Sequence, residues 1–139
     1  MNDSKVGFSS PEAAETAFYS AFTDCNVQAM NAVWADDDVI CIHPGSSALV
    51  GHDAVMRSWT NILTDADPPN LYIKVISRFV RNNFAVHVLE EHIKPASGAT
   101  GSTTVILVTN IYHQSDDGWH MVEHHASIPS SSQRQHTLQ

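Results

Sequence analysis

The chain is rich in histidine, the side chain whose ordinary pKa lies closest to neutral pH. Nine histidines accompany 15 acidic and 7 basic residues in a chain of 139 residues. His43 stands directly before a Pro-Gly pair, and His92 lies two residues after Glu90 in a segment with strand-like alternation. A carboxylate beside an imidazole orients the ring and raises its basicity, as a general base requires. These residues therefore predict acid–base chemistry.

Each of these candidates also has a simpler interpretation. The pair Glu90 and His92 has the spacing expected at the solvated polar end of a strand. His43 has the position of a turn residue that caps backbone groups. Catalysis by His43, with Glu90 orienting or tuning a histidine, is the functional hypothesis. His87, flanked by two valines, is the histidine that we expect to be the more buried.

Aromatic and amide side chains suggest a place where a ligand binds. Trp34 and Trp59 lie on apolar helical stripes, so they either belong to the core or line a cavity for a flat apolar ligand. Tyr72 and Tyr112 could add hydroxyl groups, and Asn110 must be hydrogen-bonded if it is buried. The predicted ligand-binding residues are Trp34, Trp59, Tyr72, His92, Asn110, Tyr112 and Met121.

No metal or organic cofactor is predicted. His43 and His125 could meet His87 or His92 beside Glu90 or Glu123, a donor set that suits zinc or iron. Because no predicted helix carries the histidine pair of a zinc-protease motif, a metal-dependent enzyme remains an alternative only. The run Asp36-Asp37-Asp38 lacks the spacing of a calcium loop and predicts a solvated turn that ends a helix.

The elements that must position these residues fall into two groups. Helical periodicity predicts helices from Pro11 to about Cys25 with Ser10 as cap, from Asn26 as cap to the acidic run, and from about His52 to Leu63. Alternation predicts strands over Val39–His43, Leu71–Val80, Phe84–Lys94, Ser102–His113 and Trp119–Ile128. Residues 45–51 and 95–101 are expected to be loops. Consecutive strands joined by hairpins form an antiparallel sheet, so we predict an α+β fold with three helices on one face.

Composition narrows the class of protein. The length suits one domain, with its core over about residues 10–128 and a polar tail over 129–139. A formal net charge of -8 disfavours nucleic-acid binding. Apolar runs are short, which argues against a membrane-spanning helix, and residues 1–10 show no secretory signal. With Cys25 and Cys41 in apolar contexts, a cytoplasmic protein with reduced thiols is expected.

Three strings give the chain a family likeness. They are VWADDDVICIHPG at residues 33–45, LVGHDAVMRSW at 49–59 and TNIYHQSDDGWHMVEHHAS at 109–127. Together with the order of elements they resemble the NTF2-like superfamily, in particular its SnoaL-like and ketosteroid isomerase-like members. The resemblance implies a cone in which the curved sheet and the helices enclose a pocket, and pairing into a homodimer. It also implies that His125 faces the cavity, while His124 faces outward or toward a partner subunit.

The resemblance implies a small-molecule-binding protein, with cofactor-independent isomerase, dehydratase or cyclase chemistry on an apolar or polyketide-like ligand as the catalytic hypothesis. His43 and His125 are then the acid–base candidates. The catalytic Asp of ketosteroid isomerases is replaced here by Ile42 or His43, which disfavours a steroid isomerase. Two alternatives stay open: a non-catalytic ligand carrier or association module, and the metal-dependent enzyme.

Overall fold

The computed structural model describes residues 6–65, 67–94 and 103–130. In chain order, the elements are α1 (Pro11–Thr23), α2 (Val27–Val33), β1 (Ile40–Ile42), β2 (Leu49–Val50), α3 (His52–Asp65), β3 (Asn70–Arg81), β4 (Phe84–Lys94), β5 (Thr104–Ser115) and β6 (Gly118–Ser127). The predicted loop at 95–101 and residues 131–139 of the predicted tail lie outside the described residues.

The first two helices begin where their capping residues predict. The Ser10 hydroxyl accepts a hydrogen bond from the Ala13 amide at 3.0 Å, and a proline follows it in the first turn. The Asn26 side chain accepts in the same way from the Ala29 amide at 2.9 Å. Both caps satisfy amide groups that have no partner inside their helix, so both predictions are confirmed.

The sheet is mixed rather than purely antiparallel. Its six strands follow the order β2-β1-β6-β5-β4-β3, and β3 to β6 form the expected run of antiparallel hairpins. However, β1 pairs with β6 in parallel, and the segment predicted to be a loop contributes β2, which pairs antiparallel with β1. Alternation along one strand says nothing about the direction of its neighbour, so the sequence could not indicate this pairing.

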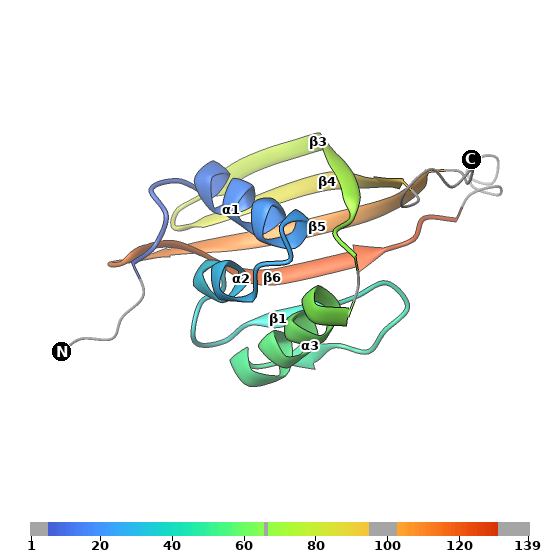
Figure 1. Ribbon diagram of the computed structural model, residues 1–139. Coiled ribbons are helices and arrows are strands. Elements are labelled where there is room, and N and C mark those ends of the chain that lie inside the picture. The colour runs from blue at the N-terminus through green and yellow to red at the C-terminus, as the bar shows by residue number, and fades with distance from the viewer. Residues whose placement is uncertain (1–5, 66, 95–102, 131–139) are drawn as a thin grey trace.

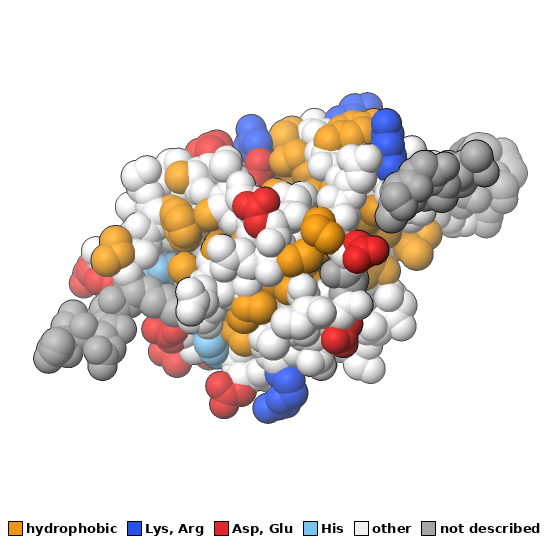
Figure 2. Space-filling model, in the orientation of Figure 1, with side chains coloured by type: hydrophobic (Ala, Val, Ile, Leu, Met, Phe, Trp, Pro, Cys, Tyr) orange, Lys and Arg blue, Asp and Glu red, His pale blue; other side chains and the backbone are white. Residues whose placement is uncertain are grey.

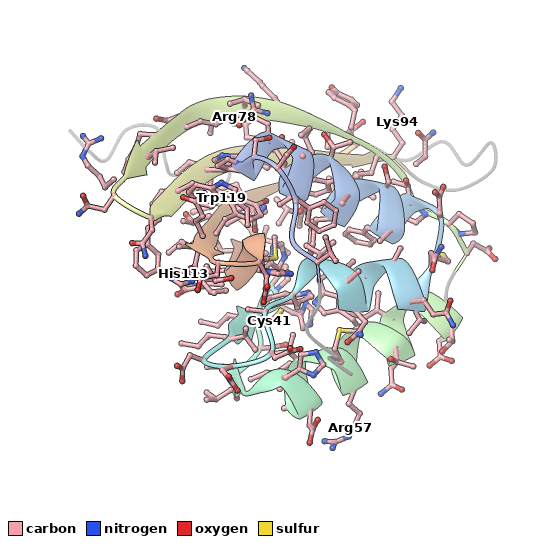
Figure 3. All side chains as sticks on the ribbon, turned by 90° about the vertical axis from the view of Figure 1, so that its left-hand side faces the viewer. Cys41, Arg57, Arg78, Lys94, His113 and Trp119 are labelled. Atoms are coloured by element: carbon pink, nitrogen blue, oxygen red, sulfur yellow. The ribbon has the colours of Figure 1, made fainter. Side chains whose placement is uncertain are left out.

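All three helices lie on one face of the sheet, which we call the inner face, and the sheet curves around them (Figures 1 and 3). The space between the two layers holds the main core. Its largest fully buried apolar and aromatic side chains are Trp34, Trp59, Tyr112, Phe18, Met30, Leu89 and Met121. The opposite face, which we call the outer face, has no covering layer among the described residues.

The segment before α1 packs against the β5–β6 hairpin. Phe8 forms a bridge with Trp119, and the Gly7 amide donates to the carbonyl of Asp117. A Cβ atom on Gly7 would lie 2.5 Å from the carbonyl oxygen of Asp117, so only glycine permits this approach. The hairpin and the start of the chain therefore act as one unit at this end of the sheet.

The side of the molecule that carries the helices shows acidic side chains spread among apolar and neutral ones, with fewer basic ones (Figure 2). This distribution agrees with the net charge of the sequence. None of the helices described is both long enough and apolar enough to cross a membrane.

Candidate functional site

A row of polar side chains crosses the inner face of the sheet. His87 on β4, Asn110 on β5 and His124 on β6 are neighbours in the strand register. All three are buried, with exposed fractions of 1%, 0% and 2%. Polar groups at such depth need hydrogen-bond partners, because a buried group without one costs about 1–3 kcal/mol.

Three hydrogen bonds join four buried residues into a chain, which we call the inner chain: His124, Asn110, Tyr19 and Glu91. His124 Nδ1 lies 2.6 Å from Asn110 Oδ1. Asn110 Nδ2 donates to the Tyr19 hydroxyl oxygen at 3.1 Å, and the Tyr19 hydroxyl donates to Glu91 Oε2 at 2.8 Å. Tyr19 lies on α1, so the inner chain links this helix to strands β4, β5 and β6.

Burial tunes the titratable members of the inner chain in different directions. It raises the pKa of Glu91 to about 7, although the hydrogen bond from Tyr19 opposes this effect. Burial, together with the charges of His43 and His125, lowers the pKa of His124 to about 3. Burial also raises the pKa of Tyr19 well above its ordinary value. Glu91 is therefore the member of the inner chain that gains or loses a proton near neutral pH.

A second cluster of polar side chains lies beside the inner chain. The Glu15 carboxylate on α1 accepts from His87 Nδ1 at 2.6 Å, and from the Arg78 guanidinium at 2.5 and 3.3 Å. Arg78 reaches from β3 toward α1 (Figure 3). Burial raises the pKa of Glu15, but the hydrogen bonds from His87 and Arg78 outweigh it, so the pKa is lowered overall. Glu15 is therefore ionised at neutral pH.

A pocket of about 280 Å³ opens between α1 and β3, and we call it the α1–β3 pocket. Its lining joins a carboxylate and several hydroxyl groups to an apolar wall. The lining residues are Glu15, Thr16, Tyr19, Ser20, Thr23, Leu71, Tyr72 and Ile73. Because Glu15 and Tyr19 both line it, the pocket meets both buried polar groups.

A larger cavity of about 480 Å³ lies at the β5–β6 hairpin end, where the outer face meets the acidic turn. It is lined by Ala35, Asp36, Asp37, Asp38, Phe84, His113, Ser115, Asp117, His120 and Val122. His113 projects on the side away from the helices (Figure 3). The acidic run is exposed, as predicted for a solvated turn, and it also forms one wall of this cavity.

The structure brings one predicted catalytic residue, His43, to the inner side of the sheet. Its Nε2 lies 2.8 Å from the Ser58 hydroxyl, and its ring packs against Trp59. Burial lowers the pKa of His43. The ring centroids of His43 and His124 are 6.4 Å apart, but neither residue lines either of the two cavities.

The expected directions of His125 and His124 are wrong. His124 is buried on the inner face and His125 is exposed. The reason is a bulge in β6: Tyr112 faces Met121, whereas Ile111 faces Glu123, so Val122 is extra. An extra residue reverses the alternation of side chains beyond it, which a strict period of two cannot anticipate.

The predicted contact between Glu90 and His92 is present, with 2.9 Å between Oε1 and Nε2. The ring of Tyr72 stacks on His92 at a centroid distance of 4.7 Å. This cluster lies on the outer face, away from the inner chain, because Glu90 and Glu91 point to opposite sides of β4. The structure therefore places Glu90 on the opposite side of the sheet from His43.

The aromatic candidates lie mainly in the core. Trp34, Trp59, Tyr112 and Met121 are buried in it, and none of them lines either cavity. Asn110 is buried and hydrogen-bonded on both sides of its amide, so the requirement stated from the sequence is met within the protein. The expectation that His87 is well buried is confirmed.

Sequence reasoning missed the residues that connect the pocket to the buried polar groups. Glu15 and Tyr19 are four residues apart in α1, a spacing that places both on one helix face. Glu91 and His87 alternate with the apolar residues of β4 that point inward. Polar residues at core positions of both patterns were a usable signal, because buried charged groups are rare unless they are paired or functional.

Within the described residues, no group of three or more His, Cys, Asp or Glu side chains is arranged to hold a metal ion. His43 lies on the inner side and His125 on the exposed side of the sheet, so the ligand set considered above does not come together.

Comparison with known proteins defines the class of protein to which this chain belongs. A family model described as a SnoaL-like domain matches residues 12–131, so the chain belongs to the SnoaL-like domain family. Among solved structures, a protein of the NTF2-like family from Streptomyces avermitilis that is provisionally assigned as a dehydratase is 26% identical. It superposes with a TM-score of 0.76, and the match covers 85% of this chain and 92% of that one.

A second solved structure is more similar in sequence. It comes from Thiobacillus denitrificans and is provisionally assigned as a calcium/calmodulin-dependent protein kinase type II association domain. It is 38% identical with a TM-score of 0.83, over 89% of this chain and 98% of that chain. A ketosteroid isomerase-like protein from Erwinia carotovora, at 19% identity and a TM-score of 0.68, covers 86% of this chain and 93% of its own; it shares the fold.

A curated plant relative also matches. The F-box protein SKIP8 of Arabidopsis thaliana is 23% identical over 117 residues, which are 84% of this chain and 48% of SKIP8. The chain therefore spans about half the length of this relative.

Proposed function

We propose that the protein binds a small carbonyl-containing molecule in the α1–β3 pocket and that Tyr19, backed by Glu91, donates a hydrogen bond to its oxygen. The observation that carries this proposal is the position of Tyr19, which lines the pocket and also donates to a buried carboxyl group at 2.8 Å. Members of this fold family are often isomerases or dehydratases, and both reactions develop charge on an oxygen.

The polar interior itself supports a site. Glu15, Glu91, His87 and His124 are each less than 4% exposed, and all belong to the hydrogen-bonded groups described above. Burying ionisable groups costs more than filling the same space with apolar side chains, even when the groups are paired. Clusters of this kind gather at functional sites, where a pKa is adjusted to a chemical task.

Glu91 supplies the proton that makes Tyr19 a donor toward a ligand. When Glu91 is ionised, the Tyr19 hydroxyl donates to it. When Glu91 is protonated, its own O–H can donate to the Tyr19 oxygen, and the Tyr19 hydrogen can turn toward a ligand oxygen. A carboxylic acid kept neutral by burial is a known means of stabilising negative charge on a reacting oxygen.

The pocket sets the size and character of the ligand. A volume of about 280 Å³ is near the lower end for small-molecule sites, so a molecule with a single ring fits better than a steroid. The apolar wall of Leu71 and Ile73 suits a hydrocarbon body, and the Thr16, Ser20 and Thr23 hydroxyls suit polar substituents.

Hydrogen exchange on a simple ketone tests the proposal without knowledge of the natural substrate. Cyclohex-2-en-1-one in D2O would lose a proton from C4 or C6, the saturated carbons whose C–H bonds the enone acidifies, to a base of the buffer, while its oxygen accepts from Tyr19. A deuteron from solvent would then return to carbon. The protein is expected to accelerate this exchange, and Tyr19→Phe to slow it about 100-fold, as mutations of catalytic acids do. Tyr72→Phe, which changes a more exposed tyrosine of the same pocket, is the matched control.

Two results would count against this function. If the ketone does not bind, as judged by the amide chemical shifts of residues lining the pocket, the proposed ligand class is wrong. If it binds without exchange above the buffer rate, the protein is a carrier rather than an enzyme. Equal exchange rates in the wild type and in Tyr19→Phe would exclude Tyr19 as the donor.

We propose, as a second role, that the outer face associates with another copy of the chain. Large apolar side chains stay exposed on it, including Phe79 (42%), Phe84 (45%) and Leu107 (38%). Several large apolar side chains exposed on one face of a sheet are typical of interaction sites. The likeness, at 38% identity, to a provisionally assigned association domain supports the same role.

Sedimentation velocity tests the association. The wild type is expected to sediment as a dimer or larger assembly, and Leu107→Glu to shift it toward the monomer. Val50→Glu changes an apolar residue that is 70% exposed on β2, at the far end of the sheet from β3, and should have no effect. A monomeric wild type at high micromolar concentration would refute this role.

A further inference from the structure

Asn110 is the one member of the inner chain that does not titrate, and it joins His124 to the directly bonded pair Tyr19 and Glu91. Its side chain has no exposed surface. Oδ1 lies 2.6 Å from His124 Nδ1 and Nδ2 lies 3.1 Å from the Tyr19 hydroxyl oxygen. An amide at this position costs desolvation free energy, which a leucine in the same place would not.

The chemistry of the amide fixes the direction of every hydrogen bond in the chain. A carbonyl oxygen can only accept, so the hydrogen between His124 and Asn110 sits on His124 Nδ1. An NH2 group can only donate, so Tyr19 accepts from Asn110 and its own hydrogen is directed to Glu91. All three donors therefore point the same way, from His124 toward Glu91.

This direction determines the tautomer of His124. A neutral imidazole carries one N–H, and here that proton is on Nδ1, so Nε2 is left as a hydrogen-bond acceptor. Burial of the ring, which strongly lowers its pKa, keeps it neutral. The ring lies among aromatic neighbours, with centroid distances of 5.0 Å to Phe18, 5.7 Å to Trp59 and 6.4 Å to His43.

The opposite direction is also chemically complete, which makes the observed one informative. With the amide turned over, Glu91 would donate to Tyr19, Tyr19 to Asn110 Oδ1, and Asn110 Nδ2 to a bare His124 Nδ1. His124 would then carry its hydrogen on Nε2. The two arrangements differ in a single property that can be measured, the tautomer of His124.

We propose that Asn110 is a positioning residue that holds His124 as the Nδ1–H tautomer and, by donating to the Tyr19 oxygen, leaves the Tyr19 hydrogen for Glu91 when that carboxyl is ionised and for the ligand when it is protonated. Its chemical consequence rests on the proposed function, because Tyr19 is the donor offered to the ligand. One amide thus sets the direction of donation toward Tyr19 and Glu91 and leaves His124 Nε2 as an acceptor away from the α1–β3 pocket.

Nitrogen-15 NMR of the histidine side chains in the full chain tests this assignment at pH 7. The His124 resonances, identified by their loss in His124→Gln, are expected to show the Nδ1–H tautomer. Asn110→Leu removes the carbonyl acceptor, so the Nε2–H tautomer should become populated. Asn110→Asp keeps an acceptor for His124 but removes the donor to Tyr19, so the tautomer should persist while the Tyr19 ring carbon signals move.

Val108→Ala is the matched control, because Val108 is a buried neighbour on the same face of β5. It should disturb packing without changing the tautomer of His124. If Asn110→Leu does not fold, the tautomer of His124 in the wild type and in Asn110→Asp still tests the proposal. An Nε2–H tautomer in the wild type would overturn the proposal, and so would a tautomer unchanged in Asn110→Leu.

The same variants separate this proposal from the proposed function. If the ketone exchange fails while the tautomer follows Asn110, the positioning role stands and the proposed function falls. If the exchange succeeds, Asn110→Asp should slow it by at least about tenfold, a loss at the lower limit of acid–base effects. An exchange rate that is unchanged in Asn110→Asp would contradict the link between Asn110 and Tyr19.

Discussion

The two faces of the sheet carry the same residue types in adjacent positions and put them in opposite environments. Glu90 and His125 lie on the outer face, whereas Glu91 and His124 lie on the inner face, buried to 3% and 2% exposure. Burial raises the pKa of Glu91 to about 7 and is the main cause that lowers the pKa of His124 to about 3. Adjacent residues of the same or similar type thus have different environments because their side chains point to opposite faces of the sheet.

The difference between the two faces explains why the candidate site lies on the inner face of the sheet. On the outer face, Glu90 contacts His92 in a partly exposed cluster, where solvent screening leaves such a contact worth about 0–1 kcal/mol. On the inner face, each polar group of the inner chain meets a specific partner and is screened little. Only there can a carboxyl group remain protonated near neutral pH, as the proposed role of Tyr19 requires.

The largest difference between the faces should be seen in packing. Phe18 is fully buried, so Phe18→Ala should lower the free energy of unfolding by about 3–5 kcal/mol. Phe84 is 45% exposed on the outer face, and Phe84→Ala should cost less than about 1 kcal/mol in the monomer. Urea denaturation measures both. Similar losses would mean that the outer face is as well covered as the inner one.

The second difference is in the response of the two glutamates to pH. Folding raises the pKa of Glu91, so its contribution to stability is present below its unfolded pKa, near 4.5, and is lost as pH rises through 7. Glu91→Gln should therefore stabilise the fold by about 2 kcal/mol at pH 8 and have little effect at pH 5. Glu90→Gln should change stability by less than about 0.5 kcal/mol at either pH. Thermal unfolding across this pH range measures both effects, and equal behaviour of the two variants would contradict the difference in environment between the two glutamates.

The third difference concerns the histidines. Folding lowers the pKa of His124, so its contribution is present above the unfolded value of 6.5 and is lost as pH falls toward 3. In the wild type, the gain at Glu91 offsets this loss between about pH 5 and 6.5. His124→Gln should reduce the acid destabilisation by about 1–2 kcal/mol, and His125→Gln should not. Identical acid limbs for the two variants would argue against a buried neutral His124.

The smallest difference is expected for two arginines of β3. Arg78 holds the buried Glu15 carboxylate with two donors, whereas Arg81 lies over the ring of Phe79 at 5.2 Å. Arg78→Lys should cost about 1 kcal/mol, because lysine lacks the planar fork that fits a carboxylate. Arg81→Lys should cost less than about 0.5 kcal/mol. Equal costs in chemical denaturation would show that the bidentate geometry does not contribute.

Much of the fold could be predicted because its signals are local. Ser10 and Asn26 cap helices by hydrogen bonds that span three residues. The parallel pairing of β1 with β6 and the bulge at Val122 depend on partners far along the chain, and neither leaves a local pattern. That single bulge reversed the expected directions of His124 and His125.

The site was harder to predict than the fold. Asn110 was identified as a residue that must be hydrogen-bonded, but its partners are 91 residues away on α1 and 14 residues away on β6. The histidine–glutamate pair with the clearest spacing in the sequence, Glu90 and His92, lies on the outer face. The pairs that matter, Tyr19 with Glu91 and Glu15 with His87, are each separated by 72 residues and meet only in the folded protein.

The most direct test of the account is the titration of Glu91 in the folded protein. Carbon-13 NMR of the glutamate side-chain carboxyl groups, with Glu91→Gln to identify the signal, reports this pKa alone. We expect a midpoint near pH 7 that moves in Tyr19→Phe, because the hydrogen bond from Tyr19 opposes the effect of burial. A midpoint near the ordinary value of 4.5, unaffected by Tyr19→Phe, would contradict the claim that the inner face holds a carboxyl group poised to donate a proton.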